Sequence, residues 1–326
     1  MKKSTHHKLI YLAAFIFALS ASCSSPPPPP KTVKTVAFIT NSASDFWKIV
    51  HKGCEKADTE LADVTVAFHT TNTGATTEQN GLIRDALDRD ADALAISVID
   101  PVAQKSVIND AAKRVLVITQ DSDAPDSDRS LYLGADNHAA GRQAGELMKK
   151  ALPQGGKVMV FVGKRDVQNA RERFEGFKES LQGSKVEVID LLTDDADPIK
   201  ARENAYQTLK KYPDIAGMVG LWSYNGPSIL EALRPEGKLG QIKIVCFDDD
   251  RATLAAIKDG TIFGTVAQQP FEYGYQAVLL AGKILRGDRS VIPGNKTILI
   301  PTVVIQRNNV DDYTKKLNHL LGITPG

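Results

Sequence analysis

Short apolar segments alternate with amphipathic stretches of helical periodicity along most of this chain, and this alternation constrains the fold more than any other feature. The apolar segments are nearly continuous aliphatic runs, which is typical of strands buried on both faces of a parallel sheet. Helices between such strands cover the two faces through right-handed crossovers. The first series of expected strands comprises residues 35–40, 65–70, 93–98 and 115–119, with helices at 46–61, 76–87 and 103–113.

The same alternation begins again in the second half of the chain. A stretch at 131–152 carries a strand into a helix that Asn137 would cap, and the small residues of this helix predict close packing rather than a site. Because 326 residues exceed what one core usually supports, we expect an α/β fold with two similar doubly wound parallel-sheet lobes. The second series comprises expected strands at 157–162, 186–191, 217–222 and 242–247, with helices at 169–181, 197–211 and 226–233.

Residues 1–23 follow the plan of a secretory signal: basic "MKKSTHHK", apolar "LIYLAAFIFAL", then small residues ending at Cys23. The apolar run is too short for a bilayer span of about 20 residues. The segment resembles a bacterial lipoprotein signal, in which the cysteine is lipidated; plain secretion with cleavage nearby is the alternative. Residues 24–34 contain "PPPPP" and predict a polyproline II spacer. We therefore expect a periplasmic or extracytoplasmic protein that contacts the membrane through lipid at Cys23.

Composition excludes several classes of function. A formal net charge of +1 gives no electrostatic basis for binding nucleic acid. Three cysteines cannot form a disulfide framework, and Cys54 and Cys246 are expected to be buried free thiols. The sequence contains no G-x-G-x-x-G, Walker A, G-x-S-x-G or H-E-x-x-H motif, and its six histidines are dispersed, so no cofactor motif, catalytic triad or metal site is indicated.

Aromatic and polar residues stand where the expected strands end. Ligands of open parallel sheets bind beyond the carboxyl ends of the strands, so two facing lobes would bring such ends together at one cleft. Singly, each residue has an ordinary structural explanation; we interpret Asp249 and Asp250, for example, as favourable charges at a helix N-terminus. The residues at these ends are Phe46, Trp47, Asp121, Arg171, Arg173, Asn225, Asp248 and Gln268.

Phe46 and Trp47 are adjacent at the start of an expected helix. Neighbouring helical positions point about 100° apart, so we expect that the two cannot both face the core and that at least one faces the cleft. Carboxylates accept, guanidinium groups donate and carboxamides do both, while aromatic rings cover apolar C–H faces. A sugar or related polyol is the simplest ligand that uses all of these groups.

The chain from about residue 35 to about residue 306 resembles the periplasmic sugar-binding proteins of the ribose-binding type, which are substrate receptors of ABC transporters. The resemblance depends on the order and spacing of "FIT…SDFW", "ITQDSDAP", "LGADNHAAGRQAG", "NARERFEGF", "YNGPSILEAL", "VCFDDD" and "TVAQQP". It implies a type I periplasmic binding fold. Lobe 1 would comprise 35–135 plus 269–299 and lobe 2 would comprise 136–268 plus 300–326, with three hinge crossings and a hinge strand within 297–310.

The resemblance also implies roles for particular residues. Two departures from the ribose receptors, Ser122 where they have an arginine and the missing aromatic residue near Ala196, predict a larger or different sugar. Arg171, beside Arg173, and Ser122, beside Asp121, are less direct candidates for ligand binding. The implied ligand-binding residues are Ser44, Phe46, Trp47, Asp121, Arg173, Asn225, Asp248 and Gln268.

We therefore expect a monomeric binding protein without catalytic residues, metal or cofactor, which closes its hinge on a sugar and is read by a membrane permease. A sensor that presents sugar to a receptor or kinase is an alternative that residues cannot separate. A carbohydrate-active enzyme would use Asp121 and Asp248 as its carboxylate pair. A repressor is excluded, because a signal segment stands where a DNA-binding helix-turn-helix would be.

Overall fold

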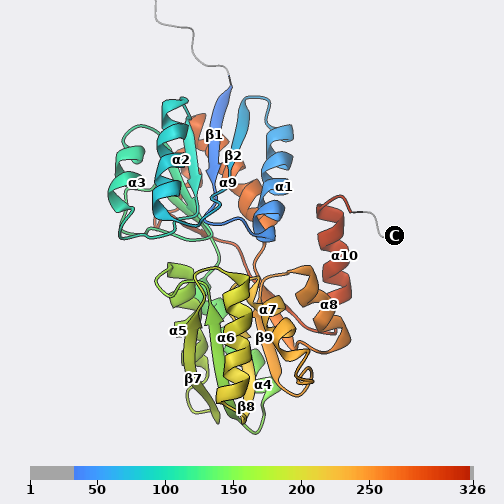
Figure 1. The fold of residues 1–326 in the computed structure, drawn as a ribbon. Helices are drawn as coiled ribbons and strands as arrows, with labels where there is room; N and C mark the ends of the chain where they lie inside the picture. Colours follow the sequence, from blue (N-terminus) through green and yellow to red (C-terminus); the bar gives the residue numbers. More distant parts are fainter. Residues whose placement is uncertain (1–32, 324–326) are drawn as a thin grey trace, which may run out of the picture. The chain divides into compact units, whose positions relative to one another are not determined.

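The computed structural model describes residues 33–323, which form two α/β lobes, each built on a six-stranded sheet (Figure 1). The expected signal segment, Cys23 and nearly all of the Pro-rich spacer lie outside the described residues. The prediction of two similar doubly wound lobes is confirmed.

The first sheet has the strand order β11-β5-β4-β3-β1-β2, and all its neighbours pair in parallel. Helices α1 and α9 cover one face, and α2 and α3 cover the other. The elements of this lobe are β1 Lys34–Ile39, α1 Asp45–Glu60, β2 Val64–His69, α2 Thr76–Asp88, β3 Ala93–Ile96, α3 Lys105–Ala112, β4 Leu116–Gln120, β5 Leu131–Gly134, α9 Pro270–Leu285, the 3₁₀ helix Arg289–Val291 and β11 Thr297–Leu299.

The second sheet repeats this order as β12-β10-β9-β8-β6-β7, with β12 antiparallel to β10. Helices α4 and α5 pack on one face, and α6, α7, α8 and α10 pack on the other. The elements of this lobe are α4 Asn137–Ala151, β6 Gly156–Val162, α5 Gln168–Ser180, β7 Val186–Thr193, α6 Pro198–Lys211, β8 Ile215–Gly220, α7 Asn225–Leu233, β9 Lys243–Phe247, α8 Arg251–Asp259, β10 Gly264–Ala267, β12 Val303–Ile305 and α10 Val310–Leu320.

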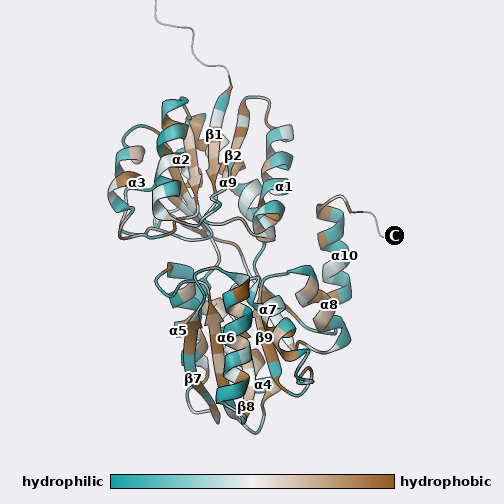
Figure 2. Ribbon diagram, in the orientation of Figure 1, coloured by the Kyte–Doolittle hydropathy of each residue, from teal (hydrophilic) through white to brown (hydrophobic). Residues whose placement is uncertain are grey.

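Burial of both sheet faces explains why the strands read as continuous apolar runs. In β1 the four residues from Val36 to Ile39 are all at most 1% exposed, and successive side chains enter the two cores on opposite faces. In Figure 2 the strands are mostly brown, whereas the outer faces of helices such as α1 carry teal residues. Most element bounds agree with the sequence-based prediction within two residues.

The chain passes between the two sheets three times: from β5 to α4, from β10 to α9, and from β11 to β12. The expected single strand within 297–310 is wrong in detail. The segment forms two short strands, β11 and β12, separated by residues 300–302, because Pro301 has no N–H to donate to a sheet.

The small residues of α4 pack against α5, as predicted. A Cβ on Gly141 would lie 2.1 Å from the carbonyl oxygen of Arg173, and one on Gly176 would lie 2.0 Å from that of His138. The N-cap prediction is wrong: the cap is Asp136, whose carboxylate accepts a hydrogen bond from the N–H of Ala139.

Within residues 33–323, none of the helices has the length and apolarity that crossing a membrane requires. Across the same residues, no group of three or more His, Cys, Asp or Glu side chains is arranged to hold a metal ion. Cys54 and Cys246 are buried free thiols, as expected.

Candidate functional site: a cavity lined by both lobes

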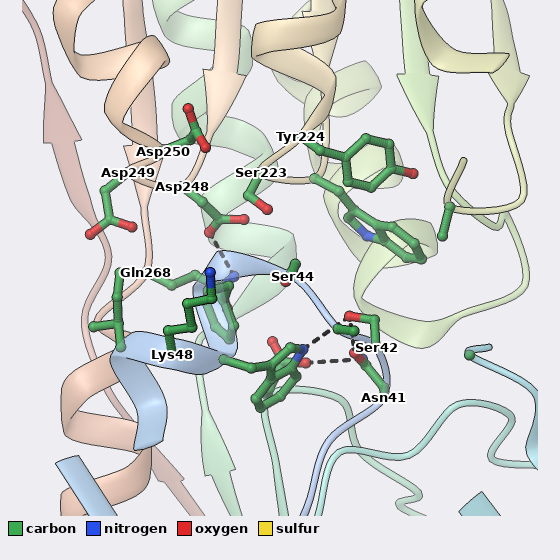
Figure 3. Close-up of a pocket in the computed structure, with 18 of the residues that line it drawn as sticks. Asn41, Ser42, Ser44, Lys48, Ser223, Tyr224, Asp248, Asp249, Asp250 and Gln268 are labelled. Carbon is green, nitrogen blue, oxygen red and sulfur yellow. Dashed lines mark hydrogen bonds between the residues drawn. The ribbon is translucent and has the colours of Figure 1, made fainter. Parts of the chain in front are cut away.

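A cavity of about 640 Å³ is lined by residues from both lobes. Figure 3 shows Asp248 and Tyr224 of the second lobe on one side and Ser42 and Ser44 of the first lobe on the other. At one edge the lobes are joined directly, because Nζ of Lys164 donates a hydrogen bond to the carbonyl oxygen of Gly74 at 3.1 Å.

Asp121 follows β4 at the carboxyl end of the first sheet. Its φ of 60° is left-handed, a conformation that Asp tolerates better than most residues, and its N–H donates to the carbonyl of Leu133 at 3.1 Å. Oδ2 accepts hydrogen bonds from Oγ of Ser97 at 2.7 Å and Nδ2 of Asn41 at 3.3 Å. Both bonds reach one oxygen, so Oδ1 is available to the cavity.

Asp248 follows β9 and occupies the equivalent position in the second lobe. Its φ is 66°, and its N–H donates to the carbonyl of Val266 on the next strand at 3.0 Å. Nε2 of Gln268 donates to Oδ1 of Asp248 at 2.8 Å (Figure 3), and Oε1 of Gln268 accepts from the hydroxyl of Tyr273 at 3.0 Å. The two lobes therefore present their carboxylates through the same backbone geometry.

Arg173 projects from α5 and is only 1% exposed. Nε donates to Oδ1 of Asn137 at 3.0 Å, Nη1 donates to the carbonyl of Leu221 at 2.8 Å, and the guanidinium lies 4.7 Å from the ring centroid of Phe247. Nη1 is also 4.0 Å from Oδ2 of Asp248. Nη2 is buried and has no hydrogen-bond partner among the described residues, so it is a rigidly held donor for a ligand.

Phe46 and Trp47 are 8% and 3% exposed, belong to the same core cluster and both line the cavity. Their rings are 5.0 Å apart and nearly perpendicular, at 81°. Nε1 of Trp47 donates to Oγ of Ser42 at 3.0 Å. The expectation that the two cannot both face the core is wrong, because the first turn of α1 lies at the boundary between the core and the cavity and both rings contact both.

Burial changes the protonation of the site carboxyls. It raises the pKa of Asp121 to about 6, against the opposing charge of Arg173. Burial also raises the pKa of Asp248, and Arg173 and the Gln268 hydrogen bond oppose this rise. Asp121 is therefore mostly ionised at neutral pH and takes up a proton as the pH falls through about 6.

Seven of the sequence-predicted residues line this one cavity, and three do not. Asn225 is fully buried behind the wall, where Nδ2 donates to Asp194 and Oδ1 accepts from the N–H of Trp222. Ser122 is buried outside the lining, and Arg171 is exposed and donates to the carbonyl of Asp166. The seven residues in the lining are Ser44, Phe46, Trp47, Asp121, Arg173, Asp248 and Gln268.

Several residues of the lining were not predicted. Trp222 and Tyr224 follow β8 and line the same cavity as Ala196, so aromatic rings are present although position 196 has none. Because both follow an apolar run that predicts a strand, their position in the sequence could have indicated that they line the cavity. Asp249 directly precedes the N-cap of α8, but it also lines the cavity and accepts a hydrogen bond from the hydroxyl of Tyr313 at 2.8 Å, which its assignment to the helix N-terminus did not include. That assignment is correct for Asp250, which caps α8.

Chemically, this cavity offers buried acceptors, one buried guanidinium donor, a carboxamide and aromatic surfaces from both lobes. Such a set suits a neutral ligand rich in hydroxyl groups. An unmade buried hydrogen bond costs about 1–3 kcal/mol, so ligands that lack a matching hydroxyl are discriminated against.

Comparisons with known proteins agree with this geometry. A family model described as a periplasmic binding protein domain matches residues 36–289. The ribose import binding protein RbsB of Haemophilus influenzae is 30% identical over 277 residues, which cover 83% of this chain and 90% of that protein.

Solved structures are similar over most of the chain. An ABC transporter solute-binding protein from Burkholderia graminis, in complex with D-arabinose, has a TM-score of 0.81 at 28% identity and covers 87% of this chain and 99% of its own. The XylFII–LytSN complex contains a chain with a TM-score of 0.78 at 28% identity, covering 85% of this chain and 98% of its own. The chain therefore belongs to the periplasmic binding proteins of the ribose-binding type, a family of sugar-binding proteins of ABC transporters.

Proposed function

We propose that this protein is an extracytoplasmic solute-binding lipoprotein that binds a monosaccharide or related polyol in the cavity and delivers it to an ABC permease. One observation carries the proposal: Trp47, Asp121, Arg173, Asp248 and Gln268, which come from distant parts of the sequence, line the same cavity. In this proposal the carboxylates and Gln268 accept from sugar hydroxyls, Arg173 donates to them, and Trp47 covers a ring face. The protein acts without catalytic residues or a cofactor.

Hinge closure would couple binding to delivery. The proposed lobes are residues 35–135 plus 269–299 and residues 136–268 plus 300–326. A ligand held by Asp121 of one lobe and Asp248 of the other favours the closed state by its differential affinity for that state. The hydrogen bond between Lys164 and Gly74 supports such an approach of the two lobes.

The test is a thermal-shift panel of pentoses, hexoses and cyclitols on residues 31–326, followed by calorimetry and small-angle scattering with the best ligand. Bound ligand raises the free energy of unfolding by mass action, by about 2.7 kcal/mol at 100 times Kd, and the apparent melting temperature rises with it. We expect a monomer that compacts on binding. Binding without compaction would contradict hinge closure, and turnover of the bound sugar would favour a carbohydrate-active enzyme instead.

The proposed lipid anchor is tested separately. Replacement of Cys23 by serine should release the protein from the membrane fraction while leaving sugar binding unchanged. Retention of the Cys23→Ser protein in membranes would contradict anchoring through this residue.

A sugar sensor is a second candidate, favoured by the similarity to the chain in the XylFII–LytSN complex. In that case the ligand-bound protein would engage a receptor or kinase. Deletion of the gene separates the two functions: loss of sugar uptake supports transport, whereas normal uptake with loss of a sugar-dependent transcriptional response supports sensing.

A further inference from the structure

Asp194 is a fully buried carboxylate that follows β7 and does not itself line the cavity. It accepts three hydrogen bonds. The hydroxyl of Tyr224 donates to Oδ1 at 2.5 Å, the N–H of Ala196 donates to Oδ1 at 3.0 Å, and Nδ2 of Asn225 donates to Oδ2 at 3.1 Å. A carboxylate is suited to this position because it is an acceptor on both oxygens.

The groups bound to Asp194 form the second-lobe wall of the cavity. Tyr224 and Ala196 are in the lining, and Asn225 fixes a third member of the wall by accepting a hydrogen bond from the N–H of Trp222 at 3.0 Å. The rings of Trp222 and Tyr224 make an edge contact, with centroids 6.4 Å apart and planes at 71°. One buried carboxylate therefore links two aromatic rings and a loop.

The loop is held in an unfavourable backbone conformation. Asp195 and Ala196 have consecutive positive φ values of 58° and 64°, which residues with a Cβ adopt reluctantly. The hydrogen bond from the N–H of Ala196 to Asp194 stabilises this turn, and both turn residues line the cavity.

The wall is also closely backed by the end of β6. A Cβ on Gly163 would lie 2.0 Å from Cζ3 of Trp222 and 2.7 Å from the hydroxyl oxygen of Tyr224. Nε1 of Trp222 donates to Oδ1 of Asn169, which also lines the cavity, at 3.1 Å. The two rings therefore have little freedom to move backwards, and their position depends on Asp194 and its partners.

We propose that Asp194 is a positioning residue that determines which sugars the cavity accepts, by fixing Tyr224, Trp222 and the turn at Asp195–Ala196. The proposal rests on the sugar-binding function proposed above. In Asp194→Asn the new amide has one acceptor oxygen, so the donor groups of Tyr224 and Asn225 can no longer both be satisfied. The wall then becomes mobile, and discrimination between sugars of different shape decreases.

The first test needs no ligand. The chain contains two tryptophans, so in a Trp47→Phe background the fluorescence reports Trp222 alone. We expect Asp194→Asn to increase acrylamide quenching of Trp222. Gly163→Ala should also change its emission, by displacing the ring directly. Asp190→Asn is the matched control, because Asp190 lies on β7, four residues before Asp194, but is exposed. Unchanged quenching in folded Asp194→Asn protein would overturn the proposal.

The second test measures specificity. Calorimetry with D-ribose, D-arabinose, D-galactose and D-glucose gives the ratio of affinities for the preferred and the poorest detectable sugar. We expect Asp194→Asn and Tyr224→Phe each to change this ratio about five-fold or more, equivalent to about 1 kcal/mol. The double variant should change it no further than the stronger single variant, because both act through one hydrogen bond.

The outcomes separate the two proposals. Equal loss of affinity for every sugar, with the ratio of affinities unchanged, would show that Asp194 has only a structural role. That result would overturn this inference but not the proposed sugar-binding function. Additive effects in the double variant would show that Asp194 does not act through Tyr224. If no sugar or cyclitol binds the unmodified protein, the proposed function fails, and this inference fails with it.

Discussion

The two site carboxylates have the same backbone setting but different charge environments, so the same substitution should affect stability differently in each lobe. Asp248 forms an ion pair with Arg173, with Nη1 at 4.0 Å from its Oδ2, whereas the charge of Arg173 acts on Asp121 from a greater distance and the hydrogen-bond donors to Asp121 are the neutral side chains of Asn41 and Ser97. Asp121→Asn is therefore the matched control for Asp248→Asn.

The magnitude follows from the separation of the charges. Two unit charges 4 Å apart interact by about 4 kcal/mol at an effective dielectric constant of 20, and removing one partner of a buried pair costs about 3–5 kcal/mol. Loss of the Asp248 charge also relieves its repulsion of Asp121 and the burial penalty that raises its own pKa, which places the expected cost at the lower end of this range, about 3 kcal/mol. For Asp121→Asn we expect a smaller loss of about 1 kcal/mol, because the amide oxygen can still accept from Ser97 or Asn41 and because burial already disfavours the charged form of Asp121.

The assay is urea denaturation of the ligand-free proteins at pH 7.5, with calorimetric titration of the best sugar in parallel. Both variants should lose sugar affinity, by about 10- to 100-fold for a charge-assisted hydrogen bond of 1.5–3 kcal/mol. Only Asp248→Asn should show the large loss in the free energy of unfolding. Equal losses of stability in the two variants would refute the assignment of the Arg173–Asp248 pair as an energetic contact.

The remaining predictions concern the cavity wall, a titrating carboxyl and helix packing. Trp47→Ala should abolish the sugar-induced thermal shift, because it removes a ring face from the cavity, while circular dichroism stays native; undiminished binding would contradict the site. Burial raises the pKa of Asp249 from 3.8 to about 7, so its contribution to stability is fully present below about pH 4 and is lost as the pH rises through about 7. The ligand-free melting temperature of the native protein, measured relative to that of Asp249→Asn, should therefore fall between pH 4 and pH 7. A difference in melting temperature that stays constant over this range would be inconsistent with the raised pKa of Asp249. Gly141→Ala should lower the free energy of unfolding by about 1–3 kcal/mol, because its Cβ would overlap the carbonyl oxygen of Arg173; a neutral effect in urea denaturation would show that α4 and α5 can separate without cost.

Local sequence determined the fold class because the hydrophobic pattern of each element reflects which of its faces are buried. Strands buried on both faces must be apolar throughout, and the helices that cover them must be amphipathic, so the two α/β series were recognisable without any long-range information. The same reasoning located most of the site, since the carboxyl ends of parallel strands share one edge. Asp121 and Asp248 could be nominated because they stand at these ends together with the other polar and aromatic residues.

Only the tertiary structure decided which residues at those ends reach the cavity. Asn225 and Tyr224 are adjacent in the sequence, yet one lies behind the wall and the other lines it, because the buried carboxylate of Asp194 binds both. Asp249 and Asp250 are likewise adjacent; one bonds to a distant helix through Tyr313, and the other caps α8. Sequence periodicity specifies which face of an element is buried, but the direction of a loop side chain depends on partners that the chain brings together only when it folds.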